Sequence, residues 1–312
     1  MTQTSRNIFL TGASGCVGHY VLDELLKYPE NKIYALVRNP HHFLSDYLSN
    51  PQIVFVKGEL KDLSPFKEIL KEMDYVIHLA TPWGGDELIS INVNATRQLW
   101  DLLNPQKIKK ILYFSTASIL GPGNKVIEEA ATLGTLYIRT KYQTYYLNQR
   151  HPLKDKIYTF FPTWIFGGDQ THPYSHASMG IKSLPQLLKM LRHFVIDFKF
   201  HFIHATDIAT VVNQVMLSEN FSQKEIVLGQ KALSLREFTL EACDYFKIKK
   251  TFGFLIPSFF IRLVALFLGD RLSDWDRYCL KQRHFVFDVT NPEKFGLKSY
   301  AGNTAELIKS FH

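Results

Sequence analysis

Residues 8–18 have the sequence IFLTGASGCVG, and this stretch decides the fold. Its first residues are apolar, glycines follow at 12, 15 and 18, and a helix-forming run begins near Tyr20. Glycines at this spacing permit a tight turn, close approach of the backbone to a pyrophosphate, and close packing of a helix on a strand. The first turn of the helix adds free N–H groups and the positive end of its dipole. We expect dinucleotide contacts from Gly12, Ser14, Gly15, Cys16, Val17 and Gly18.

Outward from this turn, short apolar or β-branched runs alternate with stretches of helix length. The predicted strands are 7–10, 32–37, 53–57, 75–79, 111–114 and 156–161, and the predicted helices lie near 16–28, 64–72, 87–103 and 134–150. Such alternation favours a parallel sheet with helices on both faces. We therefore predict an α/β protein, with a doubly wound Rossmann parallel sheet and a smaller, irregular C-terminal substrate-binding portion. The predicted boundaries are 1–162 and 163–312, with 201–215 returning to the first domain.

Composition excludes several classes of protein. The 312 residues are 46% hydrophobic and 21% charged, which supports a packed core and excludes an intrinsically disordered chain. A net charge of +7 without a long basic run gives no argument for nucleic-acid binding. The three cysteines are too far apart for a disulfide framework or a zinc site, and His78, His201 and His204 lack the spacing of metal ligands. We predict no metal site and a cytoplasmic protein.

The second predicted strand ends in Arg38. Dinucleotide-binding folds often place an acidic residue there, which holds the ribose 2′-hydroxyl of NAD. A guanidinium can instead make paired, charge-assisted hydrogen bonds to a 2′-phosphate. The sequence therefore predicts NADP (NADPH) as the cofactor.

Several further segments resemble one family. They are 76–80 (VIHLA), 92–96 (NVNAT), 115–121 (STASILG), 137–141 (YIRTK), 161–167 (FPTWIFG), 201–209 (HFIHATDIA) and 287–297 (FDVTNPEKFGL). In combination they resemble the extended (atypical) short-chain dehydrogenase/reductases of the NAD-dependent epimerase/dehydratase family. Within it, the chain is similar to the dihydroflavonol reductase and 3β-hydroxysteroid dehydrogenase-like branch, and the resemblance covers nearly the whole chain.

This resemblance implies a catalytic set of Thr116, Tyr137 and Lys141, with Ser115 and Ser118 as competitors for the role of the hydroxyl. Lys141 lies one helical turn after Tyr137, so we expect its charge to lower the pKa of the tyrosine hydroxyl and make it a proton donor and acceptor. The resemblance also implies that Lys141 reaches the nicotinamide ribose. The further cofactor-binding positions that we expect are Glu59, Leu60, Ala80, Tyr137, Lys141, Pro162 and Trp164.

The sequence departs from the family pattern at several positions. Glu59 stands where an aspartate often faces adenine, which leaves Asp62 or the backbone as alternative contacts. Phe161 and Trp164 replace an arginine and an asparagine that sugar-nucleotide enzymes often carry. Dehydratases commonly place an Asp-Glu pair after the catalytic hydroxyl, whereas this chain has residues 117–118, Ala-Ser. A dehydratase is therefore disfavoured.

We interpret the chain as an NADP-dependent oxidoreductase that interconverts a secondary alcohol and a ketone on a fairly apolar small molecule. A nucleotide-sugar epimerase is the alternative, and a non-catalytic dinucleotide sensor is a second one. The substrate, the direction of the reaction and the oligomeric state stay open, a homodimer included.

Residues 251–268 are apolar over about the length of a membrane span. Pro257 and Arg262 interrupt the run. We therefore expect a helical lid over the substrate pocket that contacts a membrane surface peripherally without crossing the bilayer. The N-terminus shows no signal peptide pattern.

Overall fold

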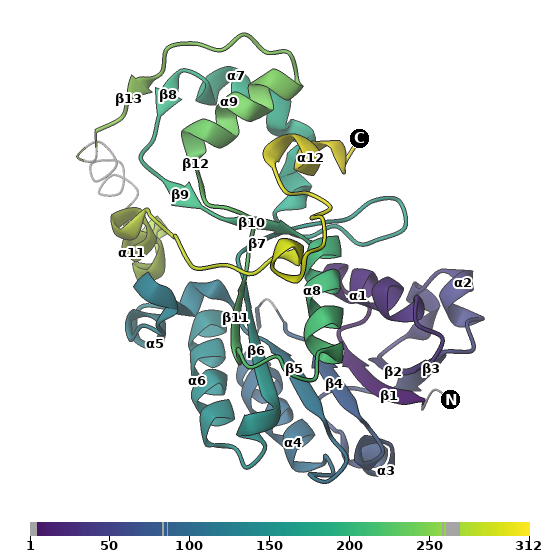
Figure 1. Cartoon of the computed structure of the whole chain (residues 1–312). Helices are drawn as coiled ribbons and strands as arrows, with labels where there is room; N and C mark the ends of the chain where they lie inside the picture. Colours follow the sequence, from purple (N-terminus) through teal and green to yellow (C-terminus); the bar gives the residue numbers. More distant parts are fainter. Residues whose placement is uncertain (1–4, 83, 86, 258, 260–268) are drawn as a thin grey trace.

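The structure is a computed structural model that describes residues 5–82, 84–85, 87–257, 259 and 269–312. A seven-stranded sheet forms its centre (Figure 1). The strands are β1 (Arg6–Thr11), β2 (Asn31–Val37), β3 (Ile53–Lys57), β4 (Tyr75–His78), β5 (Lys110–Phe114), β6 (Ile157–Pro162) and β11 (Glu225–Leu228). All are parallel, in the order β11-β6-β5-β4-β1-β2-β3. The first six follow the 3-2-1-4-5-6 order of doubly wound dinucleotide-binding sheets, so the predicted α/β class is confirmed.

Each of the six predicted strands matches an observed strand to within one residue at either end. The seventh strand, β11, was not predicted. It pairs with β6, with Ile226 opposite Phe160, although 62 residues that include α7 and α8 lie between the two strands. Four residues without alternation carry too little local signal to distinguish a strand from a loop.

The helices of the described chain vary greatly in length. They are α1 (Cys16–Leu26), α2 (Ser45–Leu48), α3 (Lys67–Lys71), α4 (Thr96–Asp101), α5 (Glu129–Thr132), α6 (Leu136–Arg150), α7 (Leu184–Leu191), α8 (Ala205–Leu217), α9 (Leu235–Tyr245), α11 (Asp274–Gln282) and α12 (Thr304–Lys309). The predicted helices near 16–28 and 134–150 are α1 and α6. The helix predicted over 87–103 is partly a π-helical turn, Ser90–Ala95, which runs directly into α4.

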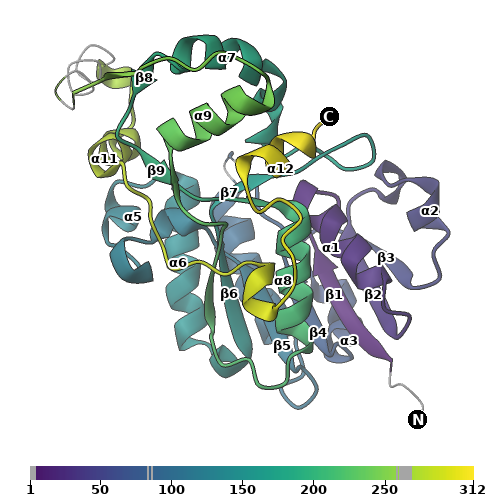
Figure 2. The ribbon, with the colours of Figure 1, turned by 45° about the horizontal axis from the view of Figure 1, so that its top comes forward.

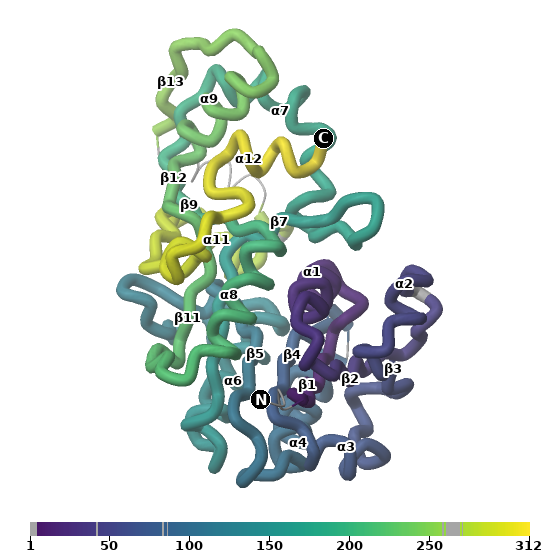
Figure 3. The backbone as a smooth tube through the Cα atoms, turned by 45° about the vertical axis from the view of Figure 1, so that its right-hand side comes forward, coloured from purple at the N-terminus to yellow at the C-terminus, as the bar shows by residue number. Residues whose placement is uncertain are grey.

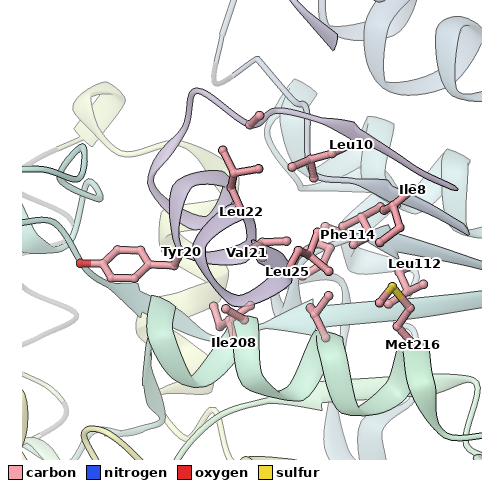
Figure 4. Packing of buried hydrophobic residues seen from close by; sticks show 14 of the residues in the cluster. Ile8, Leu10, Tyr20, Val21, Leu22, Leu25, Leu112, Phe114, Ile208 and Met216 are labelled. Atoms are coloured by element: carbon pink, nitrogen blue, oxygen red, sulfur yellow. The ribbon is translucent and has the colours of Figure 1, made fainter. Parts of the chain in front are cut away.

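Helices α1 and α8 cover one face of the sheet (Figure 4). Leu22 and Leu25 of α1 and Ile208 of α8 are fully buried in one cluster with Leu112 of β5. Burial of such a side chain contributes about 1.5–3 kcal/mol relative to exposure. Because α8 follows residue 162, the apolar face of this helix attaches the second half of the chain to the nucleotide-binding half.

The opposite face of the sheet has its own core. Phe9 lies in this second cluster while its neighbours Ile8 and Leu10 lie in the first, because successive side chains of a strand point to opposite faces. Trp100 of α4 and Leu70 of α3 fill the second cluster. Helices therefore cover the sheet on both faces, as expected for a doubly wound fold.

The remaining elements lie beyond one end of the sheet (Figures 1, 2 and 3). Three two-stranded pairs occur there: β7 (Trp164–Phe166) with β10 (Phe202–His204), β9 (Lys199–Phe200) with β12 (Leu233–Ser234), and β8 (Phe194–Val195) with β13 (Phe254–Leu255). Helices α7, α9 and α12 pack in a separate apolar cluster around Leu188, Ala242 and Leu307. This smaller, irregular portion is the region in which we expected substrate binding.

The helix predicted over 251–268 is wrong at its start. Residues 251–257 are not helical, and Phe254–Leu255 is strand β13, which hydrogen-bonds to β8. Thr251 and Gly253, which are poor helix formers, begin the segment, and pairing with β8 satisfies its backbone. Positions 258 and 260–268 lie outside the described residues. Among the residues that are described, no helix has the length and apolarity needed to cross a membrane.

Candidate active site

The turn between β1 and α1 requires glycine at two positions. Gly12 has φ +77°, and a Cβ there would lie 2.7 Å from the backbone nitrogen of Ala80. A Cβ on Gly18 would lie 2.1 Å from the Gly12 carbonyl oxygen. At Gly15 the nearest atom would be 3.4 Å away, so the chain's own packing does not demand glycine there. The space beside the Gly15 Cα would let the phosphates of a ligand approach the backbone of the turn closely.

The N-terminus of α1 is suited to an anion. Gly15 is its N-cap, no side chain caps its first N–H groups, and no acidic residue lies in its first turn. The unpaired N–H groups and the helix dipole therefore favour a phosphate at this end. Ser14 is exposed beside it, while Cys16 and Val17 are half-buried. Burial raises the pKa of the Cys16 thiol to about 12, so this cysteine is not a nucleophile at neutral pH.

A buried hydrogen-bond chain fixes the neighbouring strand ends. The His78 ring lies between the hydroxyls of Thr11 (2.7 Å) and Thr96 (2.9 Å), and Thr11 Oγ1 accepts from the Ala80 N–H at 3.3 Å. Burial, aided by the nearby Lys141 charge, lowers the pKa of His78 to about 3, so the ring is neutral. His78 is thus a structural residue that holds β4 against β1. No cluster of metal-ligating side chains occurs among the described residues.

The ends of β2 and β3 bring two predicted cofactor residues to the same edge of the sheet. Val37 of β2 pairs with Lys57 of β3. Arg38 follows β2 directly and Glu59 follows β3 after one residue, and both are exposed. Leu60 is buried and anchors the turn after β3. The alternative adenine contact, Asp62, already accepts a hydrogen bond from the Ser64 N–H at 3.1 Å.

The predicted catalytic residues meet where β5 ends. Thr116 follows β5, and Tyr137 and Lys141 lie in α6, whose N-cap Thr135 accepts from the Ile138 N–H. The Tyr137 hydroxyl is hydrogen-bonded to Thr116. Lys141 Nζ lies 5.8 Å from the centre of the Tyr137 ring and donates to the Phe114 carbonyl oxygen at 2.8 Å. Helix α6 therefore presents the tyrosine and the lysine together to the strand that carries the threonine.

Burial controls the protonation of this pair. It raises the pKa of Tyr137 to about 12, against a smaller lowering effect of the Thr116 hydrogen bond. It also lowers the pKa of Lys141 to about 7. The expectation that Lys141 lowers the tyrosine pKa is wrong for this structure, because loss of hydration dominates both groups and leaves the lysine only partly charged at neutral pH.

The structure distinguishes the three candidate hydroxyls. Thr116 Oγ1 bonds to Tyr137 and donates to Ser118 Oγ at 3.1 Å. Ser115 Oγ is buried and has no hydrogen-bond partner among the described residues. Of the three hydroxyls, that of Thr116 is hydrogen-bonded both to Tyr137 and to the hydroxyl of Ser118.

Sequence reasoning did not assign a role to Asn92. Its side chain accepts from the Thr81 hydroxyl at 2.8 Å and donates to the Thr140 hydroxyl at 2.9 Å, and so links the end of β4 to the residue before Lys141. Asn92 lies in the π-helical turn that precedes α4. Such bulges frequently occur at functional sites, but the sequence shows only an asparagine within a helical stretch.

Pro162 and Trp164 differ in their surroundings. Pro162 is buried at the end of β6. Trp164 is 51% exposed, and its ring lies 4.8 Å from that of Phe200 and 6.1 Å from that of Phe198, both in the C-terminal portion. Phe161, in contrast, is fully buried in the sheet. Phe161 packs in the same apolar cluster as Tyr137, so it belongs to the core next to α6.

A cavity of about 290 Å³ lies next to Phe198. Its lining is mainly apolar and consists of Ile196, Asp197, Phe198, Leu272, Asp276, Cys279, Leu280 and Arg283. Cys279 also packs in the same apolar cluster as Tyr137. The lining residues all come from the C-terminal portion, and none of them belongs to α6 or to the catalytic set.

Comparisons with known proteins agree with this geometry. The sequence model of the NAD dependent epimerase/dehydratase family matches residues 8–229. The chain is 31% identical over 123 residues to a decarboxylating sterol-4-alpha-carboxylate 3-dehydrogenase of Dictyostelium discoideum, over 37% of this chain and 36% of that protein. It is 24% identical over 132 residues to a UDP-glucose 4-epimerase of Rickettsia bellii, over 38% and 39%. The chain therefore aligns with less than half the length of these curated relatives.

Among solved structures, the fold is similar to that of a UDP-N-acetylglucosamine 4-epimerase from Methanobrevibacter ruminantium M1 in complex with UDP-N-acetylmuramic acid. The TM-score is 0.64 at 17% identity, over 99% of this chain and 98% of that one. At this identity the likeness concerns the fold alone.

Proposed function

Since the chain belongs to the NAD dependent epimerase/dehydratase family, we propose that it is an NADP-dependent oxidoreductase. The proposed reaction interconverts a secondary alcohol and a ketone on a fairly apolar small molecule. The observation that carries this proposal is the meeting of Thr116, Tyr137 and Lys141 at the end of β5.

The turn after β1 fits a dinucleotide. Gly12 and Gly18 leave no room for a Cβ, and the N-terminus of α1 has uncapped N–H groups for a pyrophosphate. Arg38 is exposed at the end of β2, where it can pair with a 2′-phosphate, and it takes the position at the end of this strand where an acidic residue would hold a 2′-hydroxyl. These features support NADP over NAD. When bound, the nicotinamide supplies or accepts the hydride.

Tyr137, Thr116 and Lys141 carry out the proton transfer of the proposed reaction. Because the pKa of Tyr137 is raised to about 12, its hydroxyl is protonated at neutral pH and is ready to donate to a carbonyl oxygen that gains a hydride. Thr116 donates or accepts in the same hydrogen-bond chain and orients the substrate oxygen. Lys141 is held at the Phe114 carbonyl, from which it can stabilise the phenolate that remains after transfer.

The apolar character of the substrate is inferred from the C-terminal portion. Trp164 is half-exposed against Phe198 and Phe200, and the adjacent cavity has a mainly apolar lining. A sugar diphosphate placed against such a surface would leave its polar groups unpaired, at a cost of several kcal/mol.

A nucleotide-sugar epimerase is the second candidate. The sequence similarity to a UDP-glucose 4-epimerase of Rickettsia bellii favours it. An epimerase must return the hydride to the same substrate and therefore retains its dinucleotide, whereas a net reductase exchanges it. Whether the purified protein retains its dinucleotide therefore distinguishes the two candidate functions.

The test is to measure dinucleotide content in the freshly purified chain, and then NADPH oxidation with a panel of apolar ketones and UDP-sugars. We expect little retained NAD and one reduced product for each NADPH consumed. Tyr137→Phe is the matched control, because it keeps the ring and removes the transferable proton. Tightly held NAD with epimer formation would replace the proposal by the second candidate, and NADPH binding without any turnover would indicate a dinucleotide sensor.

A further inference from the structure

The end of the molecule away from the seven-stranded sheet carries an exposed apolar surface. The exposed fractions of Phe252, Phe254 and Leu255 are 93%, 70% and 68%. Three more exposed apolar side chains lie on α7 and β8, and we call all six the apolar edge: Leu187, Met190, Phe194, Phe252, Phe254 and Leu255. Figure 1 shows α7, β8 and β13 together at this end.

The segments of the apolar edge are held together by backbone contacts. Phe194 pairs with Phe254 in the β8–β13 register. The Thr251 hydroxyl donates to the Arg192 carbonyl at 2.8 Å, and the Arg192 guanidinium donates to the Lys249 carbonyl at 2.8 Å. The exposed side chains therefore belong to an ordered surface formed by two distant parts of the sequence.

This edge is bordered by positive charge. Residues 182–196 and 246–257, which form it, contain six lysines and arginines and no aspartate or glutamate. Asp244 on α9 lies nearby and forms an ion pair with Lys250 at 2.5 Å, so five of the six cations contribute to the positive charge of the edge. Lys189 and Lys249 are exposed. A cationic border around bare aromatic and aliphatic side chains is an unusual surface for a water-exposed face of a globular protein.

We propose that the apolar edge docks this protein on a membrane surface that contains anionic phospholipid. The phenyl and aliphatic side chains enter the headgroup boundary, and the surrounding lysines lie at the level of the lipid phosphates. Figure 1 shows the turn between β1 and α1 in the other portion of the molecule, away from α7, β8 and β13. This proposal uses only the described residues and does not depend on the proposed reaction.

The experiment is co-sedimentation of the full chain with vesicles of phosphatidylcholine alone and of phosphatidylcholine with phosphatidylserine. We expect binding to the mixed vesicles that weakens as salt is raised. The double variant Phe252→Ser/Phe254→Ser should weaken binding about tenfold or more, because both side chains lose their apolar contact with lipid. Lys189→Glu and Lys249→Glu should each weaken it at least about fivefold.

Matched controls lie on the nucleotide-binding half. Leu44 is 47% exposed and Lys67 is exposed on α3, so Leu44→Ser and Lys67→Glu make the same chemical changes elsewhere and should bind vesicles like the wild type. All variants should keep the wild-type NADPH affinity, which checks the fold. The proposal is overturned if mixed vesicles are not bound, or if control and edge variants bind alike. It is also overturned if the Phe252→Ser/Phe254→Ser change abolishes a dimer in solution rather than vesicle binding.

Discussion

Replacement of Lys141 by methionine should stabilise the protein while it removes activity. Lys141 is 2% exposed, and burial lowers its pKa to about 7, whereas the pKa of a lysine in the unfolded chain is about 10.4. Between these two values the unfolded state binds more protons than the folded state, so wild-type stability rises with pH through this window. Methionine has a similar shape and carries no charge, so the variant lacks this dependence.

The magnitude follows from the two pKa values. Between pH 7 and pH 9 the lysine should add about 2 kcal/mol to the wild-type free energy of unfolding, since each pKa unit corresponds to about 1.4 kcal/mol. The lost hydrogen bond to the Phe114 carbonyl costs the variant about 1 kcal/mol at every pH. We therefore expect Lys141→Met to be more stable than wild type at pH 7, with the difference falling by about 2 kcal/mol at pH 9.

Urea unfolding of wild type and variant at pH 7, 8 and 9 measures this difference, because all other titrating groups are shared. Lys110→Met is the matched control. Burial lowers the pKa of Lys110 as well, so wild-type stability carries a pH dependence of the same sign from this residue. Its ammonium group donates to two carbonyls, those of Val215 and Ser218 at the end of α8, so its loss should destabilise the protein and leave NADPH binding intact. If the stability difference between Lys141→Met and wild type is the same at all three pH values, the lysine is fully charged in the folded protein and the reasoning fails.

Three more predictions concern the cofactor and the proton donor. Tyr137→Phe should lower turnover by about 10²–10⁴-fold and leave NADPH affinity unchanged, with Tyr146→Phe on the same helix as a neutral control; retained turnover would place the proton donor elsewhere. Arg38→Ala should weaken NADPH binding by about 1.5–3 kcal/mol in titration calorimetry and leave NADH binding unchanged; an equal loss for both dinucleotides would contradict a role at the 2′-phosphate. Gly18→Ala should abolish dinucleotide binding, because its Cβ would lie 2.1 Å from the Gly12 carbonyl oxygen; Gly180→Ala, whose Cβ has no neighbour within 4 Å, should bind normally in the same assay.

Local sequence was sufficient for the nucleotide-binding half. The six predicted strands and the glycine turn were recovered because strand periodicity and turn chemistry are properties of neighbouring residues. The spacing of Tyr137 and Lys141 placed both on one face of α6 for the same reason, since residues four apart in a helix are neighbours. The family resemblance added Thr116, and the structure joins this hydroxyl to Tyr137 by a hydrogen bond.

The tertiary structure decided what depends on distant residues. Strand β11 exists because β6 offers it an unpaired edge. Phe161 is buried in the core, and Asn92 links the end of β4 to α6 through hydrogen bonds to Thr81 and Thr140. These contacts join residues far apart in the sequence, so the spacing of neighbouring residues does not predict them. The protonation of Tyr137 and Lys141 reversed the expectation from their spacing. A pKa depends on how completely the surrounding fold removes water from the group, and only packing of the whole chain determines that.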